Sequence, residues 1–129
     1  MNDKQLIVEA LRTREHAYAP YSKFLVGAAL LAKDGRLFPG VNVENMSYGI
    51  TNCAERTAFY SAITAGLKPG DFEAIAVVGD TRDPITPCGA CRQVIVELGG
   101  KGLPVIMGNL HGNIRVASAE ELLPGTFAL

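Results

Sequence analysis

The sequence predicts an α/β protein in which helices and strands pack as layers around one core. Apolar residues make up 48% of the 129 residues, which is enough to build that core. Strand-like apolar runs alternate along the chain with segments of helical pattern, and this alternation is the second indication of the class. No linker, internal repeat or low-complexity segment divides the chain, so residues 1–129 are expected to form a single domain.

The first part of the chain predicts a helix followed by a hairpin. Apolar residues at helical spacing predict a surface helix over residues 3–17, which Ala19-Pro20 ends. Residues 24–32 form an apolar, strand-like run, and the Asp34-Gly35 pair after it is typical of a tight hairpin turn. Residues 37–44 are expected to return as the partner strand.

A second helix and a buried strand are predicted next. The helix covers residues 53–65, and Gly66 ends it as glycine often ends helices. Residues 74–78 form a short run of apolar residues only, as expected for a strand that is buried on both faces.

A third helix is predicted over residues 87–98, with two short strands and a final helix after it. The Thr86 hydroxyl can act as the N-cap, and Pro87 suits the first helical position. Gly99-Gly100 marks the end of this helix. The last elements are strands over residues 105–107 and residues 114–116, and a short helix that Ser118 caps.

Charge and terminal composition exclude several classes of function. The formal net charge is −1 and no basic run is present, which disfavours a nucleic-acid partner because such binding depends on Lys and Arg. Residues 1–5 are polar, unlike a signal peptide, and no apolar run approaches the roughly 20 residues needed to cross a membrane. A cytoplasmic location without a membrane partner is therefore expected. In that reducing setting a Cys-x-x-Cys pair indicates a metal or redox site rather than a disulfide.

The three cysteines of the chain form the pattern that indicates chemistry. Cys53 stands two residues before Glu55, and Cys88 and Cys91 form a Cys-x-x-Cys pair further along. Three thiolates that hold zinc leave a fourth coordination position open, which is what a catalytic zinc site requires. Zinc lowers the pKa of water towards neutrality, and a glutamate beside that water can carry protons. Cys53, Cys88 and Cys91 are therefore candidate zinc ligands, and Glu55 is the candidate proton carrier.

Both cysteine segments are expected to open helices. The partial positive charge of a helix N-terminus lowers the pKa of a thiol and favours the thiolate that binds metal. Cys53 and Glu55 would diverge around a helix, so they can converge only on a metal that lies beyond its end. Arg56 and Arg92 are available to offset the negative charge of three thiolates.

Other interpretations of the cysteines remain open at this point. The thiols could be buried core residues, or Cys88 and Cys91 could form a redox pair that leaves Cys53 and Glu55 without a role. A closed structural zinc site would need a fourth protein ligand, for which His16 and His111 are the candidates.

A family resemblance runs through nearly the whole chain. The residues that carry it are Tyr18-Ala-Pro-Tyr-Ser22, Phe24, Val26-Gly-Ala-Ala29, Asn42-Val-Glu-Asn45, Ser47-Tyr48-Gly49, Thr51, Cys53-Ala-Glu-Arg56, Pro87-Cys-Gly-Ala-Cys-Arg-Gln93, Leu122-Leu-Pro-Gly125 and Phe127. Three zinc ligands with a glutamate that is not a ligand are typical of zinc-dependent nucleobase deaminases. The chain thus resembles the cytidine deaminase family, specifically its small, single-domain, homotetrameric type.

The resemblance implies a fold and an activity. The implied fold is a three-layer α/β/α domain with a mixed five-stranded sheet. The implied reaction is the zinc-dependent hydrolysis of cytidine and deoxycytidine to uridine and deoxyuridine with release of ammonia, a step of pyrimidine salvage. One zinc ion per subunit would be held by Cys53, Cys88 and Cys91, hydroxide on zinc would attack C4 of the base, and Glu55 would shuttle protons.

The resemblance also implies the residues that contact the substrate. Asn42 and Glu44 would hold the ribose hydroxyls, Phe24 would pack against the base, and the backbone of Ala54 would meet the polar edge of the pyrimidine. Asn42 and Glu44 also suit vicinal hydroxyls on chemical grounds, because together they donate and accept hydrogen bonds. Without the resemblance, Phe24 would be read as a core residue and the Asn-x-Glu-Asn segment as a turn.

The remaining implied roles concern charge and assembly. Arg56 would donate hydrogen bonds to ligand sulfurs. Phe127 and the segment around Tyr48 would reach the active site of a neighbouring subunit, so the homotetramer would share its active sites.

Three competing functions remain. The first is deamination of another cytosine nucleoside, such as blasticidin S. The second is editing of nucleic acid, which the near-neutral charge disfavours. The third is a non-catalytic zinc-stabilised interaction protein, which would need four protein ligands on the metal.

Overall fold

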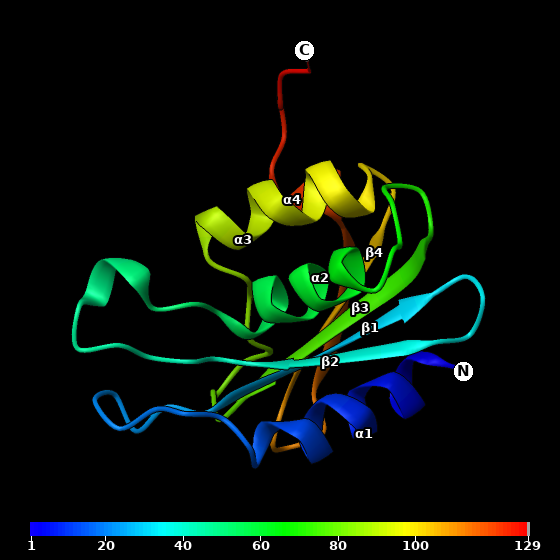
Figure 1. Ribbon diagram of the computed structural model, residues 1–129. Helices are drawn as coiled ribbons and strands as arrows, with labels where there is room; N and C mark the ends of the chain where they lie inside the picture. Colours follow the sequence, from blue (N-terminus) through cyan, green and yellow to red (C-terminus); the bar gives the residue numbers. More distant parts are fainter. Residues whose placement is uncertain (129) are drawn as a thin grey trace.

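A five-stranded mixed sheet forms the middle layer of the molecule (Figure 1). The computed structural model describes residues 1–128. The strands are β1 (Val26–Ala32), β2 (Leu37–Val41), β3 (Phe72–Gly79), β4 (Pro104–Asn109) and β5 (Ile114–Ser118), and they lie in the order β2-β1-β3-β4-β5. The β3–β4 pair is parallel and the other three pairs are antiparallel. The predicted mixed five-stranded α/β fold is therefore confirmed.

Helices cover both faces of this sheet. Helix α1 (Asp3–Arg14) lies below the sheet in Figure 1, while α2 (Ala54–Thr64) and α3 (Gly89–Val94) lie above it. A π-helical turn, Ile95–Gly99, continues α3, and the short helix α4 (Ala119–Leu122) packs against that turn and against β5. A 3-10 turn, Tyr48–Ile50, completes the elements of the described residues.

Two hydrophobic clusters hold the layers together, one on each face. The cluster under α1 contains Leu6 and Ile7 of the helix with Leu31 and Ile106 of the sheet. The cluster under α2 and α3 is larger and includes Phe59, whose ring packs edge-on against Phe72 at a centroid distance of 5.3 Å. Because β1 and most of β3 are buried on both faces, their apolar runs carry no alternation.

Two helix boundaries differ from those predicted, the end of α1 and the start of α3. Helix α1 ends at Arg14 rather than residue 17, and its start is fixed by a capping box between Asn2 and Gln5. The third helix begins after Cys88, which is its N-cap, so the prediction of Thr86 as N-cap and Pro87 as first helical residue was wrong. A Cys-Gly-Ala-Cys sequence gives no cap signal, because cysteine is not among the residues that favour N-caps.

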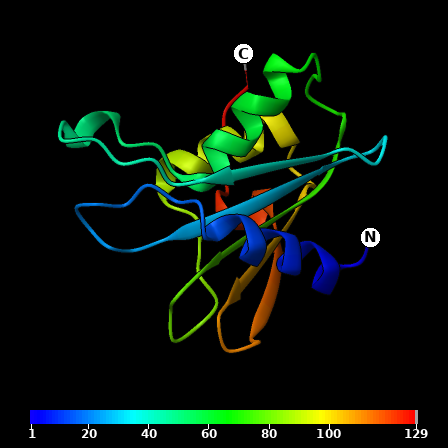
Figure 2. The same cartoon turned by 60° about the horizontal axis from the view of Figure 1, so that its bottom comes forward.

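Two loops project together beyond the end of the sheet at which β1 begins and β2 ends. Residues 18–25 and residues 42–53 extend side by side in Figure 1 and again in Figure 2. Isolated bridges pair Val43 with Tyr18 and with Asn52, and the rings of Tyr21 and Tyr48 meet edge-on at 6.3 Å. The loops therefore form one structural unit next to the N-terminus of α2. None of the helices described in residues 1–128 has both the length and the apolar character to cross a membrane.

Candidate metal centre and substrate cavity

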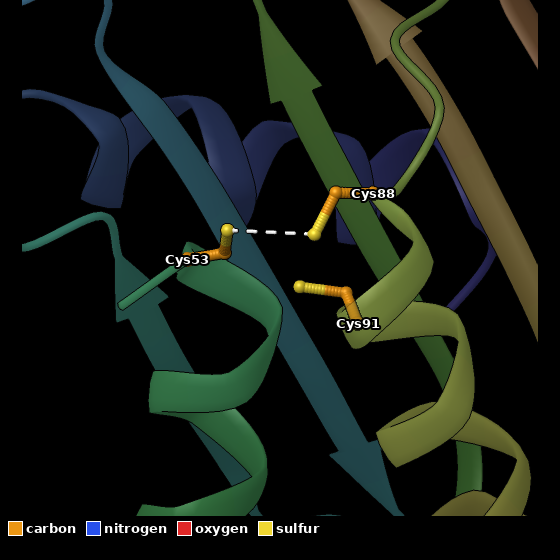
Figure 3. A group of neighbouring side chains, drawn as sticks. All are labelled: Cys53, Cys88 and Cys91. Atoms are coloured by element: carbon orange, nitrogen blue, oxygen red, sulfur yellow. Dashed lines mark hydrogen bonds between the residues drawn. The ribbon is translucent and has the colours of Figure 1, made fainter. Parts of the chain in front are cut away.

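The three cysteines converge at the tips of two helices (Figure 3). Cys53 is the N-cap of α2, Cys88 is the N-cap of α3, and Cys91 lies in the first turn of α3. Their sulfur atoms all lie within 4.8 Å of one another, and the Cys53 and Cys88 sulfurs are 3.8 Å apart. Two elements that are 35 residues apart in sequence thus present three sulfur donors to one point.

The donor set fits zinc. Thiolates are soft ligands that select zinc among the common divalent ions, and three of them leave one coordination position open. Among the described residues this is the only group of three or more Cys, His, Asp or Glu side chains with such spacing, and it contains no histidine. His16 lines a separate groove beside α1, and His111 lies 3.8 Å from Asp80, so neither supplies the fourth ligand of a closed structural site.

The electrostatics of the cluster favour a thiolate at Cys53. Interaction with the Cys91 thiol lowers the pKa of Cys53, while Cys91, which keeps the shared proton, has a raised pKa. The Arg56 Nη2 atom donates a hydrogen bond to the Cys53 sulfur at 3.3 Å, and this contact raises the pKa of Arg56. The Arg56 guanidinium thus lies in contact with the Cys53 sulfur, where its positive charge can offset that of a thiolate.

Arg92, beside Cys91, donates hydrogen bonds to two backbone carbonyls. Its Nε atom donates to the Pro87 carbonyl at 2.8 Å, and its Nη1 atom donates to the Leu122 carbonyl, also at 2.8 Å. The guanidinium thus fixes the residue before Cys88 and the end of α4. These hydrogen bonds give Arg92 a bridging role, and the expectation that its charge offsets that of the thiolates stays a prediction.

Glu55 lies in the first turn of α2, beside the sulfur cluster. Its side chain is 4% exposed, and burial raises the pKa of its carboxyl to about 7. A buried carboxyl with a near-neutral pKa exchanges protons readily at neutral pH, which suits general acid–base chemistry.

A cavity of about 330 Å³ opens beside the cluster. It is lined by Ser22, Phe24, Val26, Asn42, Glu44, Thr51, Cys53, Ala54, Glu55, Ile85, Thr86 and Cys88. The cavity therefore brings together two of the three sulfurs, the Glu55 carboxyl and four of the predicted substrate contacts: Phe24, Asn42, Glu44 and Ala54. Its walls come from the two projecting loops, from the loop between β3 and α3, and from the first residues of β1 and α2.

Asn42 and Glu44 are held by hydrogen bonds at the cavity edge. The Asn42 side chain accepts from the Val26 amide at 2.9 Å and donates to the Phe24 carbonyl at 2.8 Å. Glu44 accepts from the amides of Tyr21 and Ser22 at 3.0 Å and from the Ser22 hydroxyl. Those bonds, the Ser22 hydroxyl first, lower the pKa of Glu44 and keep it ionised. Each side chain still has donor or acceptor capacity for a ligand.

Two predicted substrate residues lie outside this cavity. Tyr48 lines the adjacent hollow with Tyr21, Ser22, Glu44 and Thr51. Phe127 is 76% exposed and lies in a third hollow against Gln93 and Val96 of the α3 segment, away from the Glu55 cavity of its own chain. Within one chain the structure therefore does not bring Phe127 to the candidate site.

Sequence reasoning missed part of the cavity wall. Ile85 and Thr86 belong to the loop before α3, and Ile85 is fixed there because its amide donates to the Gly108 carbonyl at 3.1 Å. A single apolar residue in a loop carries no sequence signal that distinguishes a ligand wall from the core. The one available signal was the closeness of Ile85 to Cys88.

Comparisons with known proteins agree with this geometry. A family profile described as the cytidine and deoxycytidylate deaminase zinc-binding region matches residues 1–107. A cytidine deaminase of Sporosarcina psychrophila is 52% identical over 128 residues, which cover 99% of this chain and 93% of that protein. A cytidine deaminase of Halalkalibacterium halodurans is 55% identical over 127 residues, with 98% and 95% covered. The crystal structure of cytidine deaminase from Burkholderia pseudomallei superposes with a TM-score of 0.97 at 59% identity, covering 98% of this chain and 100% of that one.

Proposed function

The chain belongs to the cytidine and deoxycytidylate deaminase family, and we propose that it hydrolyses cytidine and deoxycytidine to uridine and deoxyuridine with release of ammonia. The observation that carries this proposal is the cavity in which the sulfur cluster and the buried Glu55 carboxyl face the same space. A redox pair would use Cys88 and Cys91 alone and would leave Cys53, Arg56 and Glu55 without a function.

Cys53, Cys88 and Cys91 would hold the zinc ion, which would lower the pKa of water towards neutrality and so make a nucleophile available at neutral pH. The protein residues perform the proton transfers. Glu55 takes the first proton from the attacking water and delivers it to the ring nitrogen. It then takes the second proton of that water, now on the hydroxyl bonded to C4, and delivers it to the leaving amine. Overall, one water adds to the C4 carbon, the bond from C4 to the exocyclic amino nitrogen breaks, C4 becomes a carbonyl, and ammonia leaves. A pKa of about 7 lets the Glu55 carboxyl accept and donate in turn.

The cavity edge supports a nucleoside as the substrate. Asn42 and Glu44 have capacity left for the two ribose hydroxyls, while Phe24 offers an apolar surface for the base. The Ala54 backbone, in the first turn of α2, lines the same cavity and would meet the polar edge of the pyrimidine. In this assignment the sugar lies towards the projecting loops and the amidine carbon lies towards the sulfurs.

Assembly belongs to the same proposal. Large apolar side chains are exposed on the projecting loop and on the C-terminal segment, namely Met46, Tyr48, Ile50 and Phe127. Exposed apolar groups of this kind mark protein contacts. We infer a homotetramer in which Tyr48 and Phe127 complete the cavity of a neighbouring subunit, acting in the cytoplasm in pyrimidine salvage.

A substrate panel tests the proposed function. The purified, zinc-loaded protein is incubated with cytidine, deoxycytidine, blasticidin S and a cytosine oligonucleotide, and loss of the amino group is followed by ultraviolet absorbance and by ammonia release. Rapid turnover of the two nucleosides alone is expected. Faster turnover of blasticidin S or of the oligonucleotide would overturn the assignment.

A further inference from the structure

Gly40 of β2 lies directly against the first turn of α2. A β-carbon at this position would lie 2.2 Å from the Ala54 carbonyl oxygen and 2.6 Å from the Ala58 amide nitrogen. Both are backbone atoms, so rotation of a side chain cannot relieve the overlap. Gly40 is not among the glycines with a positive φ, so the approach of the helix, rather than the conformation of the strand, requires glycine here.

The contact lies at the end of α2 that carries the reactive groups. Ala54 stands between Cys53, whose sulfur belongs to the cluster, and Glu55, whose carboxyl faces the cavity. Ala54 and Ala58 are both 0% exposed, so the helix meets the strand through its smallest side chains. The backbone of β2 at Gly40 therefore packs against the backbone of α2 next to the candidate site.

We propose that Gly40 is a positioning residue that sets the distance of Cys53 and Glu55 from the cysteines of α3. The inference rests on the proposed deamination and adds a residue that does not touch the substrate. Carbon and other heavy atoms pack at roughly 3.5 Å, so a methyl group at position 40 displaces the tip of α2 by about 1 Å. A displacement of that size in a catalytic group costs on the order of 10²-fold in rate.

Gly27 of β1 supplies a matched control on the opposite face. A β-carbon there would lie 2.1 Å from the Ala10 carbonyl oxygen and 2.8 Å from the Arg14 amide nitrogen. The overlap has the same form as at Gly40, a strand glycine against the carbonyl of one helical residue and the amide four residues later. The helix concerned is α1, which carries none of the candidate site residues.

The experiment compares Gly40→Ala with Gly27→Ala in the full chain. Thermal unfolding measures the loss of stability, steady-state kinetics with cytidine measure kcat and KM, and the absorption bands of the cobalt(II)-substituted proteins report the geometry of the thiolate ligands. Gly40→Ala is expected to lower kcat by about 10²-fold, with a much smaller change in KM, and to shift the cobalt bands. Gly27→Ala is expected to lose comparable stability while its kcat and cobalt spectrum stay within twofold of the unmodified protein.

Two results would overturn the proposal. One is a Gly40→Ala protein with unchanged kcat and cobalt bands, and the other is an equal loss of kcat in Gly27→Ala. If Gly40→Ala does not fold, Ala58→Ser takes its place, because it adds an atom on the helix side of the same contact. Its kcat and cobalt bands are then compared with those of Gly27→Ala in the same way. Failure of the unmodified protein to deaminate cytidine would refute the proposed function, whereas the cobalt spectra would still decide the role of Gly40.

Discussion

A helix packs on a strand glycine on both faces of the sheet, but helix α1 begins differently from helices α2 and α3. On each face a helix rests on a strand glycine, Gly27 under α1 and Gly40 under α2. Helix α1 starts with a capping box in which Asn2 and Gln5 satisfy each other's backbone amides. Helices α2 and α3 start at Cys53 and Cys88, whose side chains make no capping hydrogen bond. The N-terminal amides of α1 are therefore partly satisfied by side chains of its own capping box. The N-termini of α2 and α3 lack such caps, so their partial positive charges face the sulfur cluster.

The largest expected effect is a loss of kcat when Glu55 of α2 is replaced, compared with no loss when Glu9 of α1 is replaced. Glu55→Gln keeps the shape of the side chain but cannot carry a proton, so kcat with cytidine is expected to fall by about 10²–10⁴-fold. Glu9→Gln changes an acid of α1 that pairs with Arg12 at 2.9 Å, and it should leave kcat unchanged. Zinc content measured on both variants should equal that of the unmodified protein. Full activity in Glu55→Gln would remove this residue from the mechanism.

Removal of zinc should destabilise the first turns of α2 and α3 and leave α1 unchanged. A ligand at a thousandfold excess over its Kd stabilises a fold by about 4 kcal/mol, and that contribution disappears when a chelator removes the ion. Hydrogen exchange is expected to accelerate in the first turns of α2 and α3, whereas the amides of α1 should exchange at their original rates. Equal acceleration in α1 would show that the metal stabilises the fold globally rather than at the two helix tips.

A core truncation under α1 should affect stability and spare catalysis. Leu6 is 1% exposed, and Leu6→Ala removes its packing against the sheet at an expected cost of about 2–5 kcal/mol. The kcat measured well below the lowered melting temperature should stay within twofold. A large loss of kcat at full folding would mean that the α1 face is coupled to the site.

The pH dependence of the metal-free protein should reveal the buried Glu55 carboxyl. Burial raises the pKa of Glu55 from 4.5 to about 7, so the charged form is disfavoured in the folded state. The neutral Glu55 carboxyl therefore contributes to the free energy of unfolding fully below pH 4.5, the pKa in the unfolded chain. This contribution is lost as the pH rises through about 7, the pKa in the folded chain. Metal-free Glu55→Gln is therefore expected to gain on the order of 1–3 kcal/mol over the unmodified chain at pH 8, and nothing at pH 4. Denaturant unfolding at the two pH values measures this, and an equal difference at both would contradict it.

The smallest expected effect distinguishes the two roles considered for Arg92. Arg92→Lys keeps the positive charge but cannot reach both the Pro87 and Leu122 carbonyls in one geometry. It is expected to cost about 1–2 kcal/mol in unfolding free energy, nearly as much as Arg92→Gln. If charge near the thiolates were the function of Arg92, the lysine variant would match the unmodified protein and only the glutamine variant would suffer.

The chemistry-bearing part of the site could be predicted from sequence because its residues are rare and fixed in spacing. Three cysteines and Glu55 in one pattern have few alternative meanings, and the strand–helix alternation placed them at helix starts. The partners of Arg92 could not be predicted, since neighbours in sequence say nothing about a carbonyl 30 residues away. Ile85 and Gly40 were missed for a related reason, because their contacts arise only when loop, strand and helix pack together.

The proposed chemistry requires that three sulfurs hold zinc and leave its fourth position to solvent beside Glu55. X-ray absorption spectroscopy at the zinc edge of the freshly purified protein, combined with metal analysis, tests it most directly. We expect one zinc per chain, with three sulfur scatterers at about 2.3 Å and one oxygen at about 2.0 Å. A fourth sulfur or an imidazole nitrogen in the coordination shell, or a protein without stoichiometric metal, would contradict it.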